Sequence, residues 1–99
     1  MAYRIIIRDR ALDDLRTIVA WYAATSTIHV RDRLEREFET AWEHLSEWPY
    51  IGRAGPNAWH SLALARFPYT TWYRVFDDAG IVRIRRILHD RDDPLKRPD

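Results

Sequence analysis

The chain has 99 residues, of which 46% are hydrophobic and 31% are charged, and its formal net charge is +1. This length suffices for one small domain with a modest core, and the apolar content argues against a disordered chain. The sequence contains no cysteine, which excludes disulfides, thiolate catalysis and cysteine-ligated metals. The nearly neutral charge does not mark a general nucleic-acid binder.

Neither a leader nor a membrane span is visible in the sequence. The apolar run Ile5-Ile6-Ile7 is too short for either and is followed by charged residues. The four histidines are too far apart along the chain to show a metal-ligand spacing. We therefore expect a cytoplasmic protein with no metal, no cofactor and no membrane partner.

The first half of the chain predicts a strand followed by two helices. Residues 3–8 are rich in β-branched side chains, which is typical of a buried strand. Asp9 is placed to cap a helix over residues 10–24, in which apolar residues recur at helical spacing. This stripe contains Ala11, Leu15, Ile18 and Tyr22, and Leu12 and Val19 widen it.

A second amphipathic helix is predicted over residues 28–48, after the break at Thr25-Ser26-Thr27. Pro49 ends it, and the short connection between the helices favours an antiparallel hairpin. Its apolar stripe contains Leu34, Phe38, Ala41 or Trp42, Leu45 and Trp48.

The second half of the chain predicts a loop and three strands. Residues 49–59 contain two glycines and two prolines and form the loop, and the strands cover residues 61–66, 70–77 and 81–89. Asp77-Asp78-Ala79-Gly80 supplies the last hairpin turn. The element order β-α-α-β-β-β predicts an α+β fold, in which a helical hairpin covers a three-stranded antiparallel sheet. We expect a single domain over residues 1–94 and a frayed tail over residues 95–99.

The last strand alternates apolar residues with arginines, and one arginine breaks the alternation. Val82, Ile84 and Leu88 share one parity, and Arg86 falls on that same parity. Its head group either pairs with a carboxylate, from the helices or from Asp92 or Asp93, or lines a groove for a ligand.

No catalytic constellation stands out. His60 and Ser61 are adjacent on a predicted strand, so their side chains point to opposite faces. The cluster His89-Asp90-Arg91-Asp92-Asp93 could support catalysis. A histidine with a pKa near neutral can act as acid or base, and an arginine can stabilise a phosphate charge, which suits RNA cleavage by attack of the 2′-hydroxyl. The alternative is a cluster of paired charges without catalysis.

Four patterns in this order resemble a known family. They are Ala11-Leu12-Asp13-Asp14-Leu15 with Trp21-Tyr22, Pro49-Tyr50-Ile51-Gly52-Arg53, Arg66-Phe67-Pro68-Tyr69 before Tyr73-Arg74-Val75, and Arg86-Ile87-Leu88-His89 before Arg91-Asp92. Over nearly its whole length the chain resembles the RelE/ParE superfamily of bacterial type II toxin–antitoxin toxins, and within it the ParE branch. This resemblance implies a growth-inhibiting toxin held inactive by a cognate antitoxin, commonly a small DNA-binding regulator with a flexible C-terminal half.

The resemblance leaves the molecular target open. ParE-like toxins poison DNA gyrase and have no accepted catalytic set, whereas RelE-like toxins cut mRNA on the ribosome. RelE-like nucleases carry an arginine at a position that falls near Thr70 in this chain. They also carry lysines around the preceding strand, where this chain has none. Both differences favour the ParE branch. His89 and Arg91 lie near positions where some nucleases keep a histidine or arginine, and they are the catalytic candidates of the alternative.

The resemblance and the composition together suggest contact residues, because aromatic residues and arginines dominate interface energetics. We expect the antitoxin to bind Trp21, Tyr22, Trp72, Arg83 and Arg85, and the target to bind Arg86, His89 and Arg91. No catalytic residue is expected in a ParE-like protein, and no direct DNA binding without the antitoxin. A third interpretation is an inactive toxin that survives only as half of an autorepressor complex.

Overall fold

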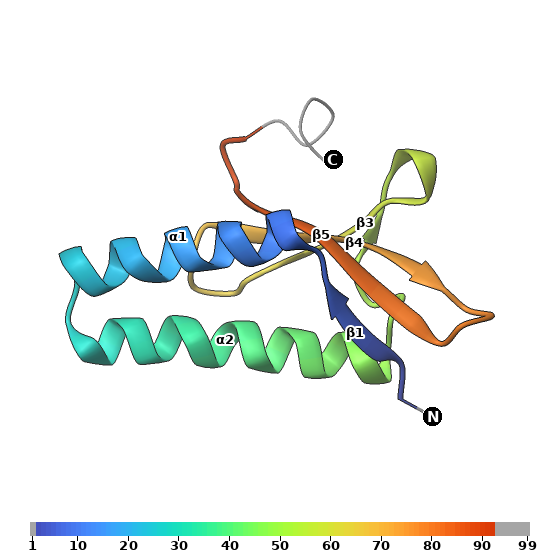
Figure 1. Cartoon of the computed structure of the whole chain (residues 1–99), viewed down its shortest axis with the longest axis horizontal. Coiled ribbons are helices and arrows are strands. Elements are labelled where there is room, and N and C mark those ends of the chain that lie inside the picture. The colour runs from blue at the N-terminus through green and yellow to red at the C-terminus, as the bar shows by residue number, and fades with distance from the viewer. Residues whose placement is uncertain (1, 93–99) are drawn as a thin grey trace.

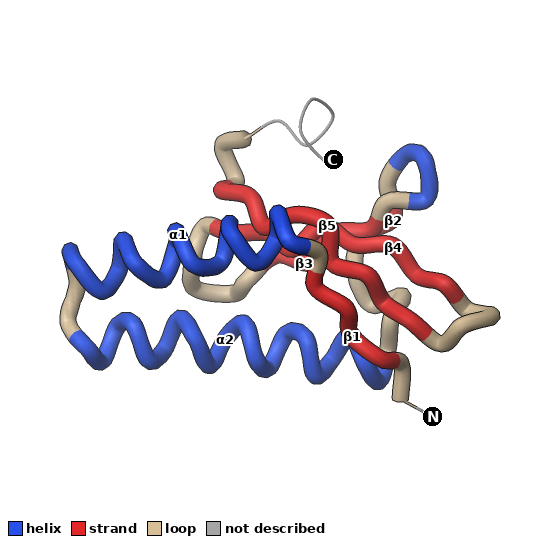
Figure 2. Tube along the Cα trace, viewed as in Figure 1, coloured by secondary structure: helices blue, strands red, loops and turns tan. Residues whose placement is uncertain are grey.

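The computed structural model describes residues 2–92, and in it two helices lie side by side against one face of a sheet (Figures 1 and 2). The predicted tail over residues 95–99 lies outside the described residues. The elements are β1 (Arg4–Ile7), α1 (Asp9–Thr25), α2 (Ile28–Glu47), β2 (Arg53–Ala54), the short 3₁₀ turn η1 (Pro56–Ala58), β3 (His60–Ala63), β4 (Tyr69–Phe76) and β5 (Ile81–His89).

The sheet has the strand order β1-β5-β4-β3-β2, with β1 parallel to β5 and the other neighbours antiparallel. The predicted α+β fold and its element order are confirmed. Four strands were predicted, and the structure adds a fifth, the two-residue β2, within the predicted loop. The predicted N-terminal strand, β1, also joins the sheet by pairing with β5.

The core forms where the helix stripes meet one face of β4 and β5. Ile18 of α1 and Leu34 and Phe38 of α2 pack in one buried cluster with Tyr73 and Ile84 of the sheet. Cross-strand partners share a face of the sheet, so Ile5 and Ile7 of β1, opposite Val82 and Ile84, also face the helices. The predicted apolar stripes of both helices therefore face the sheet, except for Trp48, which follows the end of α2 and is 60% exposed.

The two helices differ at their N-termini, because α2 has a side-chain cap and α1 has none. Thr27 caps α2, and its hydroxyl accepts a hydrogen bond from the Val30 amide. Asp9, the predicted cap of α1, is instead the first helical residue, and Arg8 occupies the cap position. The prediction was wrong because the Arg8 amide still donates to the Ile84 carbonyl, which keeps Arg8 extended as the end of the strand.

A β-bulge in β5 changes which side chains face the helices. Tyr73 pairs with Ile84 and Trp72 pairs with Arg86, so Arg85 is an extra residue between these two consecutive pairs. An extra residue shifts the alternation by one, and Ile87 then joins Ile84 on the helix side. The regular alternation assumed from the sequence was therefore wrong beyond Arg85, which is why Arg86 seemed misplaced.

Asp14 of α1 completes the edge of β5 where β1 ends. One carboxylate oxygen accepts from the Ile87 amide at 3.0 Å and from Arg86 Nε at 2.7 Å, and the other accepts from Arg86 Nη2 at 3.0 Å. The two side chains are only 10% and 17% exposed. The hydrogen bond to Asp14 is the main cause of the raised pKa of Arg86. We call this arrangement the Asp14 clasp.

The clasp decides between the two interpretations of Arg86. The Arg86 guanidinium pairs with Asp14, a helix carboxylate, in agreement with the first interpretation. Asp92 adds a weaker electrostatic attraction. Asp93, the other candidate, lies outside the described residues.

A buried tyrosine fixes the loop before β2. The Tyr73 hydroxyl donates to the Pro49 carbonyl at 2.8 Å and accepts from the Gly52 amide at 3.2 Å. A Cβ atom at Gly52 would overlap both this hydroxyl and the Ser61 carbonyl oxygen. Glycine is therefore required here by close approach, not by an unusual φ.

We predict that Asp14→Ala lowers the free energy of unfolding by about 3 kcal/mol, because it leaves the Arg86 cation and the Ile87 amide without their shared acceptor in a largely buried site. Urea unfolding followed by circular dichroism measures this. Asp13→Ala is the matched control, since Asp13 is 75% exposed and makes only a long contact with Arg16. Equal effects of the two variants would contradict the role of the clasp.

We predict that Gly52→Ala costs about 2 kcal/mol of stability, because the added methyl group must displace the Tyr73 hydroxyl or the Ser61 backbone. Gly55→Ala serves as the control, since the nearest atom to its Cβ would be the Trp59 carbonyl oxygen at 3.6 Å. Thermal unfolding compares the two variants. A Gly52→Ala protein as stable as Gly55→Ala would show that the loop has room to relax.

Candidate functional site: the open face of the sheet

The helices cover one face of the sheet, and the other face carries the arginines of the strands. Pairing places Arg74 opposite Arg83, Trp72 opposite Ser61, and Phe76 opposite Ile81. These partners alternate with the helix-facing residues Thr71, Tyr73 and Val75, so they point away from the helices. We call this side the open face.

Aromatic rings hold the arginines of the open face in place. The Arg74 guanidinium carbon lies 4.2 Å from the Trp59 ring centroid, and that of Arg85 lies 5.7 Å from the same ring. The Arg83 guanidinium carbon lies 4.6 Å from the Phe76 ring centroid. A stacked guanidinium keeps its N–H edges available for carboxylates or phosphates.

The placement of these charges is unfavourable for the isolated protein. Arg74 and Arg83 are direct cross-strand partners, and like charges directly opposite each other destabilise a sheet. The stacking on Trp59 and Phe76 offsets part of this repulsion, and an anionic partner would remove it. The arrangement is therefore suited to bind an acidic surface.

A cavity of about 400 Å³ lies at the end of the open face and has a different character. Its lining includes Arg53, Thr70, Trp72, Asp90 and Asp92. The Thr70 hydroxyl donates to an Asp90 carboxylate oxygen at 2.8 Å. Thr70 lies near the position at which RelE-like nucleases carry an arginine, and its hydroxyl is already hydrogen-bonded within the protein. His89 also lines it, and among the described residues around the cavity two carboxylates face one arginine, which disfavours an RNA phosphate.

His89 borders this cavity, but its ring contacts the helix side of the sheet. It packs edge-on against Tyr69 with centroids 5.5 Å apart, and Tyr69 packs in turn against Tyr22 of α1. Burial, with a smaller contribution from the hydrogen bond with Tyr22, raises the pKa of Tyr69 to about 12. Tyr69 therefore stays protonated at neutral pH and does not supply a general base.

His89 and Arg91 touch through the backbone. The Arg91 amide donates to His89 Nδ1 at 3.1 Å. Among residues 2–92, no side-chain contact joins the His89 imidazole to the Arg91 guanidinium. The two nuclease candidates are thus neighbours without forming a catalytic pair.

The residues predicted to bind the antitoxin lie on two separate surfaces. Trp21 is 56% exposed near the end of α1, and Tyr22 is half-buried against Phe67 and Tyr69. Trp72 and Arg83 belong to the open face, on the other side of the sheet, and Arg85 reaches it over Trp59. Among the predicted target-binding residues, Arg86 is held in the Asp14 clasp.

Two members of the open face were missed by the sequence analysis. Arg74 lies opposite Arg83, and Trp59 is buried beneath the Arg74 guanidinium. The alternation of residues 70–77 placed Arg74 on the same face as Trp72, so this signal was present. Trp59 could not be assigned to a face of the sheet in this way, because it precedes β3 and lies in the predicted loop over residues 49–59.

Two classes of site are absent from the described part of the chain. Residues 2–92 contain no group of three or more His, Asp or Glu side chains placed to hold a metal ion. None of the helices in this range is long and apolar enough to cross a membrane.

Comparison with known proteins gives the family. Residues 5–94 match the family model described as the ParE toxin of type II toxin–antitoxin systems, parDE. No curated protein sequence matches the chain.

Solved structures show the same fold at low identity. A chain of the chromosomal ParDE toxin–antitoxin system of P. aeruginosa has a TM-score of 0.73 and 19% identity, over 89% of this chain and 96% of its own. The RelBE2 toxin–antitoxin complex of Mycobacterium tuberculosis has a TM-score of 0.62 and 22% identity, over 90% and 99%. A double mutant of the E. coli RelE toxin in the free state has a TM-score of 0.61 and 21% identity, over 92% and 86%.

The family match spans nearly all of the chain, and the element order and sheet agree with the fold of these structures. The chain therefore belongs to the ParE toxin family of type II toxin–antitoxin systems.

Proposed function

We propose that this protein arrests growth by binding DNA gyrase through the open face, and that a cognate antitoxin neutralises it. The observation that carries the proposal is the set of arginines stacked on aromatic rings on a face that the helices leave uncovered. Membership in the ParE family supports gyrase as the target. Such a toxin acts in the cytoplasm.

The chemistry of the open face favours binding over catalysis. Arginines and aromatic residues dominate the energetics of protein interfaces, and pre-stacked guanidinium groups lose little side-chain entropy on binding. Carboxylates of the target would neutralise Arg74 and Arg83 together and remove their mutual repulsion. The described residues offer no nucleophile–base pair that would suggest turnover instead.

The second candidate is an mRNA endoribonuclease using His89 and Arg91. The similarity to RelE and the cavity beside His89 favour it. The two carboxylates of that cavity, Asp90 and Asp92, weigh against it. An inactive toxin, retained only in an autorepressor complex, would be recognised by the absence of growth arrest.

The expected partner is an antitoxin encoded beside this gene, since the solved relatives come from ParDE and RelBE systems. Trp21 and Tyr22 remain proposed contacts for it, because Trp21 is a large exposed apolar side chain next to an edge-packed aromatic cluster. Contact with the open face as well would let the antitoxin compete directly with the target.

We predict that the purified protein inhibits DNA supercoiling by gyrase and that Arg83→Glu weakens this inhibition at least tenfold, since it reverses a charge at the proposed contact. The introduced carboxylate would face Arg74, an opposite-charge pair that suits the sheet, so the fold is expected to survive. Arg16→Glu makes the same change of charge on exposed helix surface and should inhibit like the unaltered protein.

Primer extension on translated mRNA tests the alternative in parallel. The proposal would be wrong if gyrase were unaffected, mRNA were cleaved at defined positions and His89→Ala abolished that cleavage. Loss of inhibition in Arg16→Glu to the same extent as in Arg83→Glu would instead refute the assignment to the open face.

A further inference from the structure

A small cavity lies where β1 ends, α1 begins and β5 bulges. Its volume is about 300 Å³, and the described residues that line it are Arg8, Asp9, Arg10 and Arg85. Figure 1 shows the beginning of α1 beside β5 at this place. No aromatic or aliphatic side chain is among these described residues, so charge decides what the cavity can bind. We call it the arginine cavity.

The end of β1 brings Arg8 to this cavity. Ile7 pairs with Ile84 and faces the helices, and the Arg8 amide still donates to the Ile84 carbonyl at 2.9 Å. The backbone of Arg8 is extended, so its side chain points to the side opposite Ile7. Arg8 therefore lies on the side of the sheet that carries the open face, where it lines the cavity together with Arg85.

The bulge brings Arg85 to the same cavity. Arg85 is the extra residue of β5, and a β-bulge typically re-aims a side chain. Its guanidinium carbon lies 5.7 Å from the Trp59 ring centroid, which restricts the side chain before any ligand binds. Arg10, in the first turn of α1, adds the third guanidinium.

The charges of the lining favour an anion. Three arginines and one carboxylate give a formal balance of 3 − 1 = +2. Like charges gathered in a small space repel each other, and an anion between them removes this repulsion. Each guanidinium has five N–H donors, so Arg10 and Arg85 can bind an anion in addition to their other contacts.

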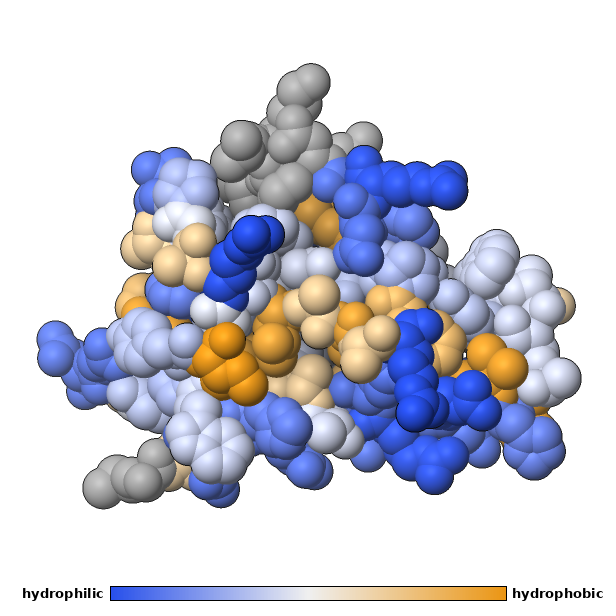
Figure 3. Space-filling view, turned by 180° about the vertical axis from the view of Figure 1, so that it is seen from behind, coloured by the Kyte–Doolittle hydropathy of each residue, from blue (hydrophilic) through white to orange (hydrophobic). Residues whose placement is uncertain are grey.

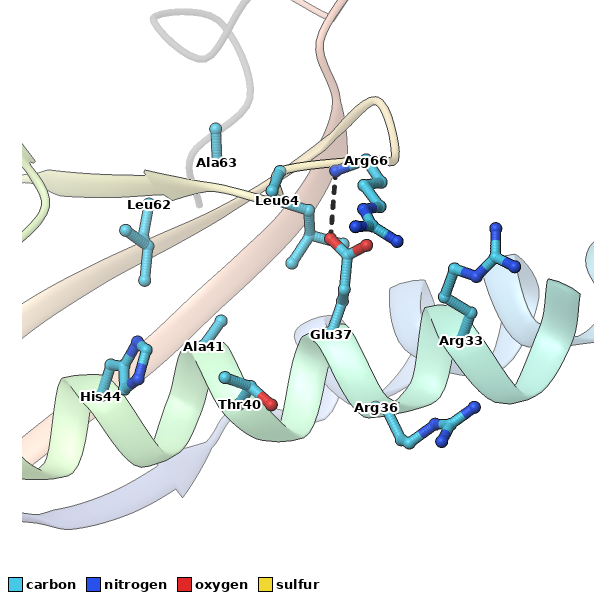
Figure 4. A pocket seen from close by; sticks show the side chains of 11 residues that line it. Arg33, Arg36, Glu37, Thr40, Ala41, His44, Leu62, Ala63, Leu64 and Arg66 are labelled. Atoms are coloured by element: carbon cyan, nitrogen blue, oxygen red, sulfur yellow. Dashed lines mark hydrogen bonds between the residues drawn. The ribbon is translucent and has the colours of Figure 1, made fainter.

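The groove between α2 and β3 is of a different kind. Arginines line it too, but Ala41, Leu62 and Leu64 add apolar side chains, and Figure 4 shows Leu62 and Leu64 pointing from the strand toward α2. The face seen from behind likewise carries an apolar band bordered by hydrophilic residues (Figure 3). Such surfaces suit ligands with apolar parts, whereas the arginine cavity offers charged groups to a bare anion.

We propose that the arginine cavity binds a single dianionic phosphate group. Such a group carries nearly two negative charges at neutral pH and presents several acceptor oxygens, which three guanidinium groups match. A nucleotide base would find no aromatic ring among the described lining residues, and a volume of about 300 Å³ is at the lower end for small-molecule sites.

Two sources share this chemistry. One is free phosphate, and the other is the 5′-terminal phosphate of a nucleic-acid strand, whose next nucleotides Arg85 would connect to the open face. Binding of either one goes beyond the proposed function and does not depend on gyrase being the target, so the two proposals stand or fail separately.

Titration of the full-length protein with inorganic phosphate, followed by NMR at constant ionic strength, tests the cavity. The amide signals of Arg8 and Arg10 and the side-chain N–H signal of Arg85 should shift and reach saturation. Arg10→Gln should bind phosphate about tenfold more weakly, the effect of one lost charge-assisted hydrogen bond. Arg16→Gln, the same change at a 71% exposed side chain of α1, should bind like the unaltered protein.

Two oligonucleotides of one sequence, with and without a 5′-phosphate, separate the sources. Displacement of inorganic phosphate by the phosphorylated strand alone would assign the cavity to strand ends. If neither strand displaces it, the ligand is free phosphate. Equal displacement by both strands would refute the recognition of a dianionic phosphate.

The inference is overturned if the shifts grow without saturation, if acetate binds as tightly as phosphate, or if Arg10→Gln binds phosphate as tightly as Arg16→Gln. The titration of the unaltered protein locates the site even if Arg10→Gln fails to fold, since it needs no variant.

Discussion

The fold depends on one carboxylate that joins the helical layer to the edge of the sheet. β1 pairs with β5 only as far as Ile84, where the chain leaves the sheet to begin α1. Asp14, on the second turn of α1, then takes the place of the missing strand by accepting from the Ile87 amide. Since the same carboxylate binds Arg86 in a bidentate pair, it also neutralises a largely buried cation.

The clasp and the bulge together determine what the sheet presents to solvent. The extra residue at Arg85 turns Ile87 into the core and places Arg86 where it can reach Asp14. Arg83 and Arg74 remain on the opposite face, stacked on aromatic rings. A chain with a net charge of only +1 thus still places several arginines close together on one face of its sheet.

The architecture leaves one face of the sheet without a helical cover. This open face offers fixed guanidinium groups and aromatic rings, which suits a rigid acidic surface.

Much of the fold was predictable from local sequence signals. The helix stripes around Ile18 and Phe38, the helix-ending Pro49 and the Asp77–Gly80 turn gave the element order directly. The parallel pairing of β1 with β5 was not predictable, because strand neighbours far apart in sequence are chosen by tertiary packing. One sequence feature indicated the bulge at Arg85: Arg86 occupies a position that regular alternation assigns to the apolar face of the strand.

The candidate site was predictable only in part. Arg83, Arg85 and Trp72 were predicted as antitoxin contacts, which stays a prediction, and alternation along residues 70–77 would have placed Arg74 on the same face as Trp72. The stacking on Trp59 depends on a residue outside any regular strand. Such a residue has no periodic signal in the sequence, so only the structure reveals the contact.

Native-state hydrogen exchange at the Ile87 amide tests the central claim most directly, because this group has no strand partner on the Asp14 side of β5. The account predicts that it exchanges about as slowly as the Ile84 amide in the unaltered protein and at least a hundredfold faster in Asp14→Ala, while amides in α2 change far less. Fast exchange at Ile87 in the unaltered protein, or slow exchange that persists in Asp14→Ala, would contradict it.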